Sequence, residues 1–216
     1  TAGIAASRVL EAYAQAGGDI TVSARSTNRL IDLNGAGVTL AVGSFSAAGG
    51  GLDIALDVAN TVAASIDLGD RNRAITAGGA LAVTAGQPEE MSSNVVNVTA
   101  AVAQIGLAVG AATMSSRHAS GVSSDIRRSL VNAGKISQTA TSELDVTRTD
   151  VTGVSAGTVA VVVNVAKVEA EALVATRVTD ATLIAAGDLV LSAKYDIFTR
   201  ASGIGVSAGL GAVGAS

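Results

Sequence analysis

Alternation with a period of two residues dominates the hydrophobic pattern of this chain. In residues 158–178, valine occupies every position of one parity from Val159 to Val165, and the other parity is mostly alanine and valine. Such an alternation, rich in β-branched residues, is typical of strands, and apolar residues on both parities indicate burial on both faces. Frequent glycine opposes helices. We therefore expect an all-β fold.

A seven-residue pattern recurs along the chain and predicts a repeat architecture. Its copy at residues 187–193 is Gly-Asp-Leu-Val-Leu-Ser-Ala, and earlier copies start at Gly18, Gly79 and Gly134, with separations of 61, 55 and 53 residues. Self-similarity at a roughly fixed period is the mark of stacked repeats. We expect residues 1–216 to form a single solenoid segment of a longer array. Residues 1–17 would end one unit, and further units would start at 18, 79, 134 and 187, the last incomplete.

A second marker follows each of these glycines. The segment Gly153-Val154-Ser155-Ala156-Gly157 recurs at residues 205–209, and residues 37–41 hold its counterpart in the first unit. In the second unit the nearest match starts at Gly106, farther from its glycine. This spacing predicts a surface-loop insertion around residues 88–90, because loops tolerate added residues.

Stacking gives such units a way to bury their apolar faces. Each strand can pair in parallel with its equivalent in the next unit, about 4.8 Å away. The pattern predicts a parallel β-solenoid built from repeats of about 53–61 residues. It leaves open whether a unit is one wide coil or two to three narrower ones, although the long run at 158–178 favours wide coils.

Composition narrows the classes of function. The chain is 49% hydrophobic but only 2% aromatic, so its core must consist of small and β-branched side chains. A net charge of −4 lacks the basic footprint of nucleic-acid binding or of attraction to anionic lipid. With no cysteine, disulfides and thiolate metal sites are excluded.

The repeat pattern resembles a known family. Residues 16–24 (Ala-Gly-Gly-Asp-Ile-Thr-Val-Ser-Ala), residues 153–157 and Val163-Asn164-Val165-Ala166 are similar to repeats of giant bacterial adhesins of the filamentous-haemagglutinin-like and leukotoxin-like kind. The resemblance implies a right-handed β-helical stalk, secreted or on the bacterial cell surface, that serves adhesion, biofilm matrix or filament assembly. Open strand edges at the ends of the stack predict self-association end to end, or contact with neighbouring repeats of the same chain. Host or surface glycans would be bound through other regions.

No residue pattern predicts catalysis. His118 is the only histidine, and although Ser115, Ser116 and Asp125 are close in sequence, no Gly-x-Ser-x-Gly elbow surrounds them. We interpret His118 as a surface residue in a repeat turn. The prediction is a protein that is not an enzyme, with no catalytic, cofactor-binding or metal-binding residues.

Paired carboxylates support an alternative function, a β-helix that binds or degrades polysaccharides, because glycoside hydrolysis uses two such groups. Glu169 and Glu171 would share one strand face about 7 Å apart. Solvated charges on an outer face are the commoner explanation, and aromatic platforms for sugars are scarce. The candidate pairs are Glu89 with Glu90, Glu169 with Glu171, and Asp145 with Asp150.

A calcium site has one weak candidate. Residues 49–57 resemble a single copy of the glycine- and aspartate-rich nonapeptide of calcium-binding β-rolls. Such sites are built by consecutive copies, so we interpret this stretch as a glycine-rich turn. We expect no cofactor.

Two features of the sequence bear on a membrane location, an uncharged run and the alternating strands. Residues 91–116 are uncharged and long enough for a membrane helix, but their counterpart carries Lys167, Glu169 and Glu171. An outer-membrane β-barrel is the second alternative, since alternating strands are typical of it, but it requires aromatic girdles. We expect no membrane insertion.

Overall fold

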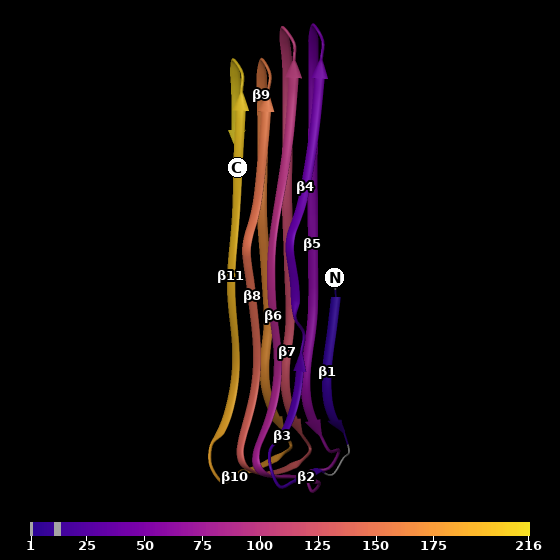
Figure 1. The fold of residues 1–216 in the computed structure, drawn as a ribbon, viewed down its shortest axis with the longest axis vertical. Coiled ribbons are helices and arrows are strands. Elements are labelled where there is room, and N and C mark those ends of the chain that lie inside the picture. The colour runs from indigo at the N-terminus through magenta and orange to yellow at the C-terminus, as the bar shows by residue number, and fades with distance from the viewer. Residues whose placement is uncertain (1, 11–13) are drawn as a thin grey trace.

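Long strands make up this protein, seen here in a computed structural model that describes residues 2–10 and 14–216 (Figure 1). No helix occurs among these residues, so the all-β prediction is confirmed. The strands are β1 (Ala2–Leu10), β2 (Ala14–Ala16), β3 (Ile20–Arg25), β4 (Asn28–Val42), β5 (Phe45–Asp67), β6 (Ala74–Val102), β7 (Ile105–Arg127), β8 (Leu130–Ala156), β9 (Val159–Thr179), β10 (Thr182–Ala185), β11 (Leu189–Ala208) and β12 (Gly211–Ala215).

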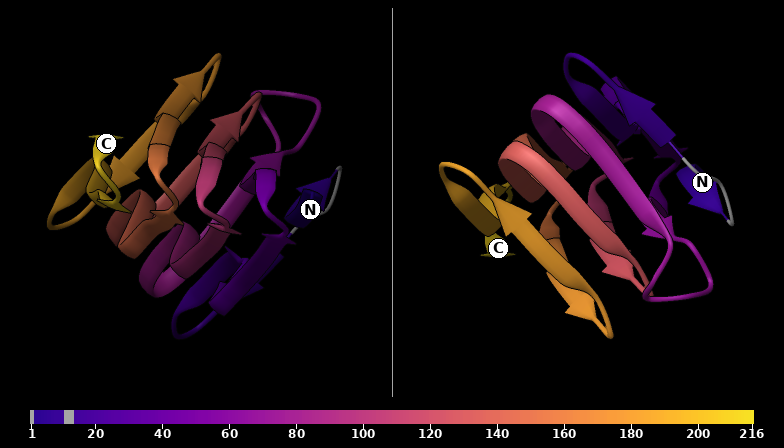
Figure 2. Two further views of the ribbon diagram at one scale, coloured as in Figure 1. Left: turned by 90° about the horizontal axis from the view of Figure 1, so that it is seen from above. Right: turned by 90° about the horizontal axis from the view of Figure 1, so that it is seen from below.

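Two parallel sheets face each other (Figure 2). Sheet A has the order β1-β5-β7-β9-β12, and sheet B contains β10-β8-β6-β2, with β11 on β8 and with β3 and β4 on β6. The chain ascends in sheet B, turns, and descends in sheet A (Figure 1). Each unit is therefore one wide coil of two long strands, and the parallel β-solenoid prediction is confirmed.

The residues that follow the repeated glycines stack on one another. Leu81 pairs with Ile20 on one side and Ile136 on the other, and Ile136 pairs in turn with Leu189. Equivalent positions of successive units thus form straight ladders across sheet B. The stacking direction runs across the strands, so the long axis of Figure 1 is the strand direction.

The predicted insertion in the second unit is wrong. Asn97, rather than Gly106, pairs with Gly37 and Gly153. Pro88 lies inside β6, where it pairs with Glu143. Most of the extra length of the first unit is instead in the turn at 68–73, which is replaced by 128–129 in the next coil. Matching glycine to glycine failed because an asparagine takes the glycine position in this coil.

An apolar core fills the space between the sheets near the turns that join sheet A back to sheet B. Its largest members are at most 1% exposed. Burial of each such side chain contributes about 1.5–3 kcal/mol to folding. These residues include Ile66, Leu68, Ile75, Leu81, Val83, Ile126 and Ile136.

The glycine-rich stretch at 49–51 is not a turn but part of β5, so that interpretation is also wrong. Gly50 faces inward, where an added Cβ would lie 2.5 Å from Thr39 Oγ1 and 2.9 Å from Thr99 Oγ1. Its missing side chain allows the two sheets to approach closely at this level.

Candidate functional site

The outer strands of the stack form its first candidate functional surface. Among the described residues, β4 has a strand neighbour only in β6, and β11 only in β8. The outward edge of each therefore presents backbone N–H and C=O groups to a further strand. Such an edge is a template for pairing with another coil or chain.

Side-chain pairs of opposite charge connect neighbouring coils along the stack. Arg29 lies 3.0 Å from Glu90, Arg117 lies 3.3 Å from Glu171, and Lys135 lies 3.3 Å from Asp188. Because these pairs are exposed, each contributes about 0–1 kcal/mol. They favour the observed register more than they add stability.

Asp67 and Arg128 form a bidentate link of this kind, at the ends of adjacent coils. Arg128 donates from Nε at 2.9 Å and from Nη2 at 2.6 Å to the two carboxylate oxygens of Asp67. This bidentate contact is the main cause that lowers the pKa of Asp67, and the backbone N–H of Gly69 adds to it. Arg128 has a φ of 41°, a strained value for arginine that this contact helps to hold.

His118 lies inside the protein, so the prediction of a surface histidine in a turn is wrong. It is 2% exposed in β7, and its Nδ1 is 2.5 Å from Oε1 of Glu89, itself 8% exposed in β6. Gln87 and Asn60 donate to Oε2 of Glu89 at 3.3 and 3.4 Å. The parity of Leu81 and Val83, continued along β6, would have placed Glu89 inside.

The serines and aspartate near His118 do not form a catalytic arrangement with it. Ser115 is on the opposite parity of β7, and Asp125, which is buried, pairs with Arg127 at 3.3 Å rather than with His118. Ser116 shares the inward parity of His118 and is buried, and its hydroxyl has no hydrogen-bond partner. No nucleophile–base contact joins any of the three to the histidine among the described residues.

The carboxylate pairs separate between the inside and the outside. Glu89 points inward, whereas Glu90 points outward to Arg29. Glu169 and Glu171 share the outer face of β9, as expected from their spacing. A hydrogen bond and the charge of Lys167, 2.5 Å away, lower the pKa of Glu169.

Asp145 and Asp150 lie on either side of an irregularity in β8. Asp145 is exposed, and Asp150 pairs with Arg148. Asp145 borders a shallow outer hollow of about 240 Å³ together with Glu90 and Glu143. Three outward-facing acidic side chains therefore surround this one hollow. Glu90 is already neutralised there by Arg29.

Buried amides join the two sheets, a feature that the sequence analysis missed. Asn97 in β6 donates to the carbonyls of Gly50 and Ala111 at 3.2 and 2.8 Å. Gln138 in β8 donates to the carbonyls of Ser124 and Arg177. Each amide thus contacts two adjacent strands of sheet A, and ties neighbouring coils together from inside.

The described part of the chain holds no cluster of three or more histidine, cysteine, aspartate or glutamate side chains arranged to bind a metal ion. It contains no helix with the length and hydropathy of a membrane-crossing segment.

No protein-family model, curated protein or solved structure matches this chain.

Proposed function

We propose that this protein is a structural stalk or fibre-forming segment of a secreted or surface-exposed bacterial adhesin. The observation that carries the proposal is the straight register between coils, as in the ladder of Ile20, Leu81, Ile136 and Leu189. Because each coil repeats the pairing surface of the previous one, more coils of the same chain or of another copy can extend the stack.

The mechanism of such a segment is mechanical. Each strand contributes a continuous row of parallel hydrogen bonds to its neighbours, and β6 alone has 29 residues. The buried amides and apolar core hold the two sheets together, so adjacent coils resist sliding and bending. A stiff stack of this kind would hold an adhesive region away from the cell, or build a biofilm filament.

The dimensions of the stack provide the test. A coil of about 55 residues advances about 4.8 Å, which corresponds to about 11 kDa of protein per nanometre of stack. Electron cryomicroscopy of the native material should show long ribbons with a 4.8 Å repeat along their axis and this mass per length. Compact particles without that repeat would reject the proposal.

A polysaccharide-binding or polysaccharide-degrading β-helix is the second candidate. It rests on the outer hollow that gathers Glu90, Glu143 and Asp145. Binding to a glycan array that Glu143→Gln abolishes would favour it over a purely structural role. The stalk is better supported, because it uses the whole stack rather than one hollow.

A further inference from the structure

The coils change character at one end, called here the apolar end. It surrounds the turns that join sheet B to sheet A, at the top of Figure 1. The segments that the strand register gathers there contain no charged residue in any coil. These segments are 33–52, 91–116, 151–166 and 201–216.

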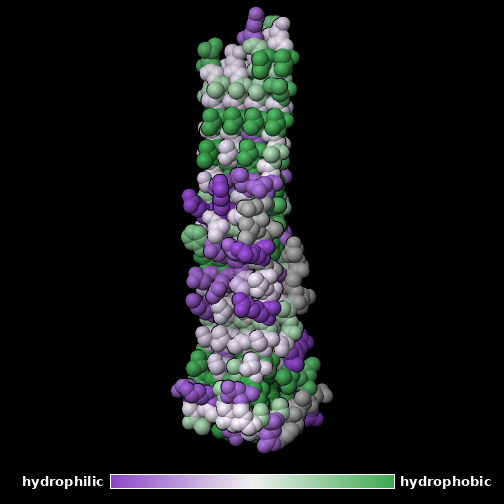
Figure 3. All heavy atoms as spheres, viewed as in Figure 1, coloured by the Kyte–Doolittle hydropathy of each residue, from purple (hydrophilic) through white to green (hydrophobic). Residues whose placement is uncertain are grey.

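Large apolar side chains cover the outside of both sheets at this end. The visible face is hydrophobic there over several coils (Figure 3). Phe45 and Leu210, at the turns, are 79% and 95% exposed. The outward positions include Val38, Leu40, Val42 and Val206 on sheet B, and Ile105, Leu107, Val109, Val159, Val163 and Val165 on sheet A.

The interior at the same end includes polar and very small residues beside apolar ones such as Val95 and Val162. Asn97, Thr99, Ser155 and Asn164 are at most 2% exposed between the sheets, and Gly50 packs beside them. At the other end the interior consists of isoleucine, leucine and valine. The outer face of the same strands thus changes from polar to apolar, while polar side chains enter the interior.

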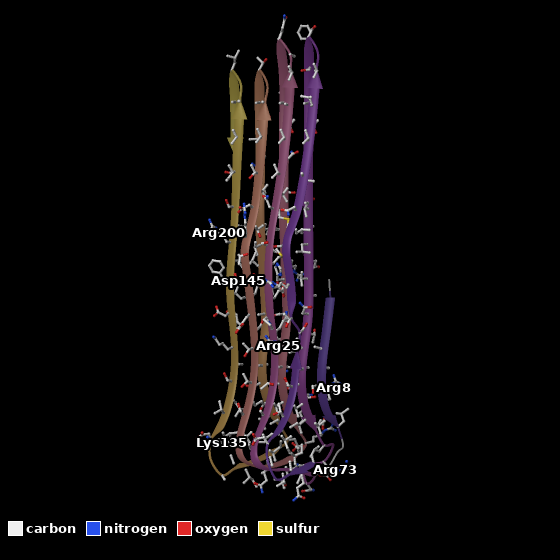
Figure 4. The ribbon with its side chains drawn as sticks, in the orientation of Figure 1. Arg8, Arg25, Arg73, Lys135, Asp145 and Arg200 are labelled. Atoms are coloured by element: carbon white, nitrogen blue, oxygen red, sulfur yellow. The ribbon has the colours of Figure 1, made fainter. Side chains whose placement is uncertain are left out.

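Charged residues form a collar where the two arrangements meet. On sheet B it includes Arg148 and Asp150, and on sheet A it includes Lys167 and Glu169. The charged residues labelled in Figure 4 lie below the apolar end, with Arg200 the uppermost. Both signs of charge occur, so the collar does not select for an anionic surface.

Hydrogen bonds between coils satisfy backbone groups at the turns of the apolar end. The Gly43 N–H donates to the Val102 carbonyl at 3.2 Å, and the Gly157 N–H to the Ala208 carbonyl at 3.0 Å. Thr158 Oγ1 accepts from the Gly106 N–H at 3.1 Å. Pairing of this kind is what a backbone requires in a medium without water.

We infer that the apolar end inserts into the hydrocarbon of a lipid bilayer, with the charged collar at the headgroups. A second protein would cover one face, whereas here both outer faces are apolar and the turns, which include Ser44, Gln104 and Thr158, carry no charge, as a surrounding fluid requires. The outward apolar positions, Val96 to Val102 on β6 and Ile105 to Ala111 on β7, each extend over about 20 Å at 3.3 Å per residue, about two thirds of a hydrocarbon core of about 30 Å. This inference replaces our expectation of no membrane insertion.

The inference rests on the proposed function in one respect. Open sheet edges are excluded from hydrocarbon, so β4 and β11 of sheet B, and β5 and β12 of sheet A, need partners there. Stacking of further coils supplies those partners. The form that inserts is therefore the filament of the proposed function, which would lie along the bilayer with a row of apolar ends in the hydrocarbon and the core-bearing ends in water, rather than the stalk that projects from the cell.

Flotation with phosphatidylcholine vesicles tests the inference on the native stacks. Val98 and Val154 are paired on the outer face of sheet B at the apolar end, and Ala82 and Ser137 are paired on the same strands and face at the other end. V98K/V154K should lower the fraction bound by roughly tenfold or more, because a lysine on a lipid-facing strand is strongly unfavourable. A82K/S137K should bind like the parent protein.

A second measurement gives the depth of single residues in the bilayer, and it does not depend on whether the lysine variants fold. The chain has no tryptophan, so Val102→Trp at the apolar end and Thr84→Trp at the other end each give a single fluorophore. Brominated phosphatidylcholine should quench the first and leave the second unchanged.

Absence of quenching at position 102 would overturn the inference. So would equal flotation of V98K/V154K and the parent, or ribbons that pair face to face through the apolar ends without binding lipid. Ribbons with the 4.8 Å repeat that ignore vesicles would reject lipid insertion but keep the stalk. Vesicle binding by particles without that repeat would reject the stalk.

Discussion

His118 contacts Glu89 inside the two sheets, whereas the equivalent positions in the next coil hold Ala170 and Leu144. A buried polar pair in one coil therefore lies directly beside an apolar pair in the next coil. The Nε2 atom of His118 has no hydrogen-bond partner among the described residues. One hydrogen-bonding group of the pair therefore has no partner there. Substitution of both residues can measure the net effect of the pair on the free energy of unfolding.

The apolar pair of the neighbouring coil indicates which variants to compare in that measurement. H118A alone leaves the Glu89 carboxyl buried without its main partner, and should cost about 3 kcal/mol of unfolding free energy. E89L/H118A copies the apolar pair of the next coil and should be close to the parent or more stable. Urea denaturation of both single variants and the double variant completes the cycle. A double variant as unstable as the two single losses added together would show that the residues do not act as a pair.

Asp67 gives the stack a dependence on pH. Its pKa is lowered in the folded protein, mainly by Arg128, so its contribution is complete above the ordinary unfolded value of about 3.9 and is lost as pH falls through the folded value. D67N should therefore cost about 1 kcal/mol at pH 7 and almost nothing at the lowest pH. Urea denaturation from pH 7 to pH 2 measures the difference.

A matched control is E143Q, which removes an exposed carboxylate from the outer face of β8. It should change stability little at any pH. A cost of D67N that stayed constant down to pH 2 would contradict the role assigned to its ionised form.

Gly50 tests how closely the sheets approach. G50A places a methyl group within 2.5 Å of Thr39 Oγ1, so it should destabilise the protein by about 1–3 kcal/mol. G49A is the control one residue away, where nothing lies within 4 Å of the new Cβ. It should be neutral or slightly stabilising, because alanine loses less backbone entropy than glycine. Thermal unfolding of both variants decides the matter, and equal melting temperatures would refute the close approach.

Local patterns were enough to predict the strands and their parallel stacking. The valine alternation at 159–165 is a property of one strand, and the glycine-anchored repeat at 18, 79, 134 and 187 requires only comparison of the chain with itself. Both survive in the structure because a solenoid converts sequence repetition directly into strand pairing. The width of the coil needed the structure, since a repeat length alone does not fix the number of turns.

It was harder to predict which side chains are buried and which are exposed, because hydropathy does not follow burial throughout this protein. His118 and Glu89 are charged or polar and yet buried, whereas Phe45 and Leu210 are apolar and exposed. Reasoning from hydropathy placed His118 on the surface for that reason. Strand parity, followed from the core end of β6, is the more reliable signal here.

Asn97 shows the same difficulty at a single ladder position, where the other coils hold glycine. Its amide donates two hydrogen bonds to buried carbonyls of sheet A. N97A should cost about 1–3 kcal/mol, because those bonds are lost. N97D should cost more, since a buried carboxylate has no N–H to donate and faces carbonyl oxygens.

Asn94 provides the control on the same strand, with its side chain on the outer face. N94A should change the unfolding free energy by less than about 0.5 kcal/mol. Urea denaturation at pH 7 should therefore rank the variants N94A, N97A and N97D from most to least stable. If N97D matched the parent at pH 7, the amide would not be donating to the opposite sheet, and Asn97 would merely fill the space that glycine leaves in the other coils.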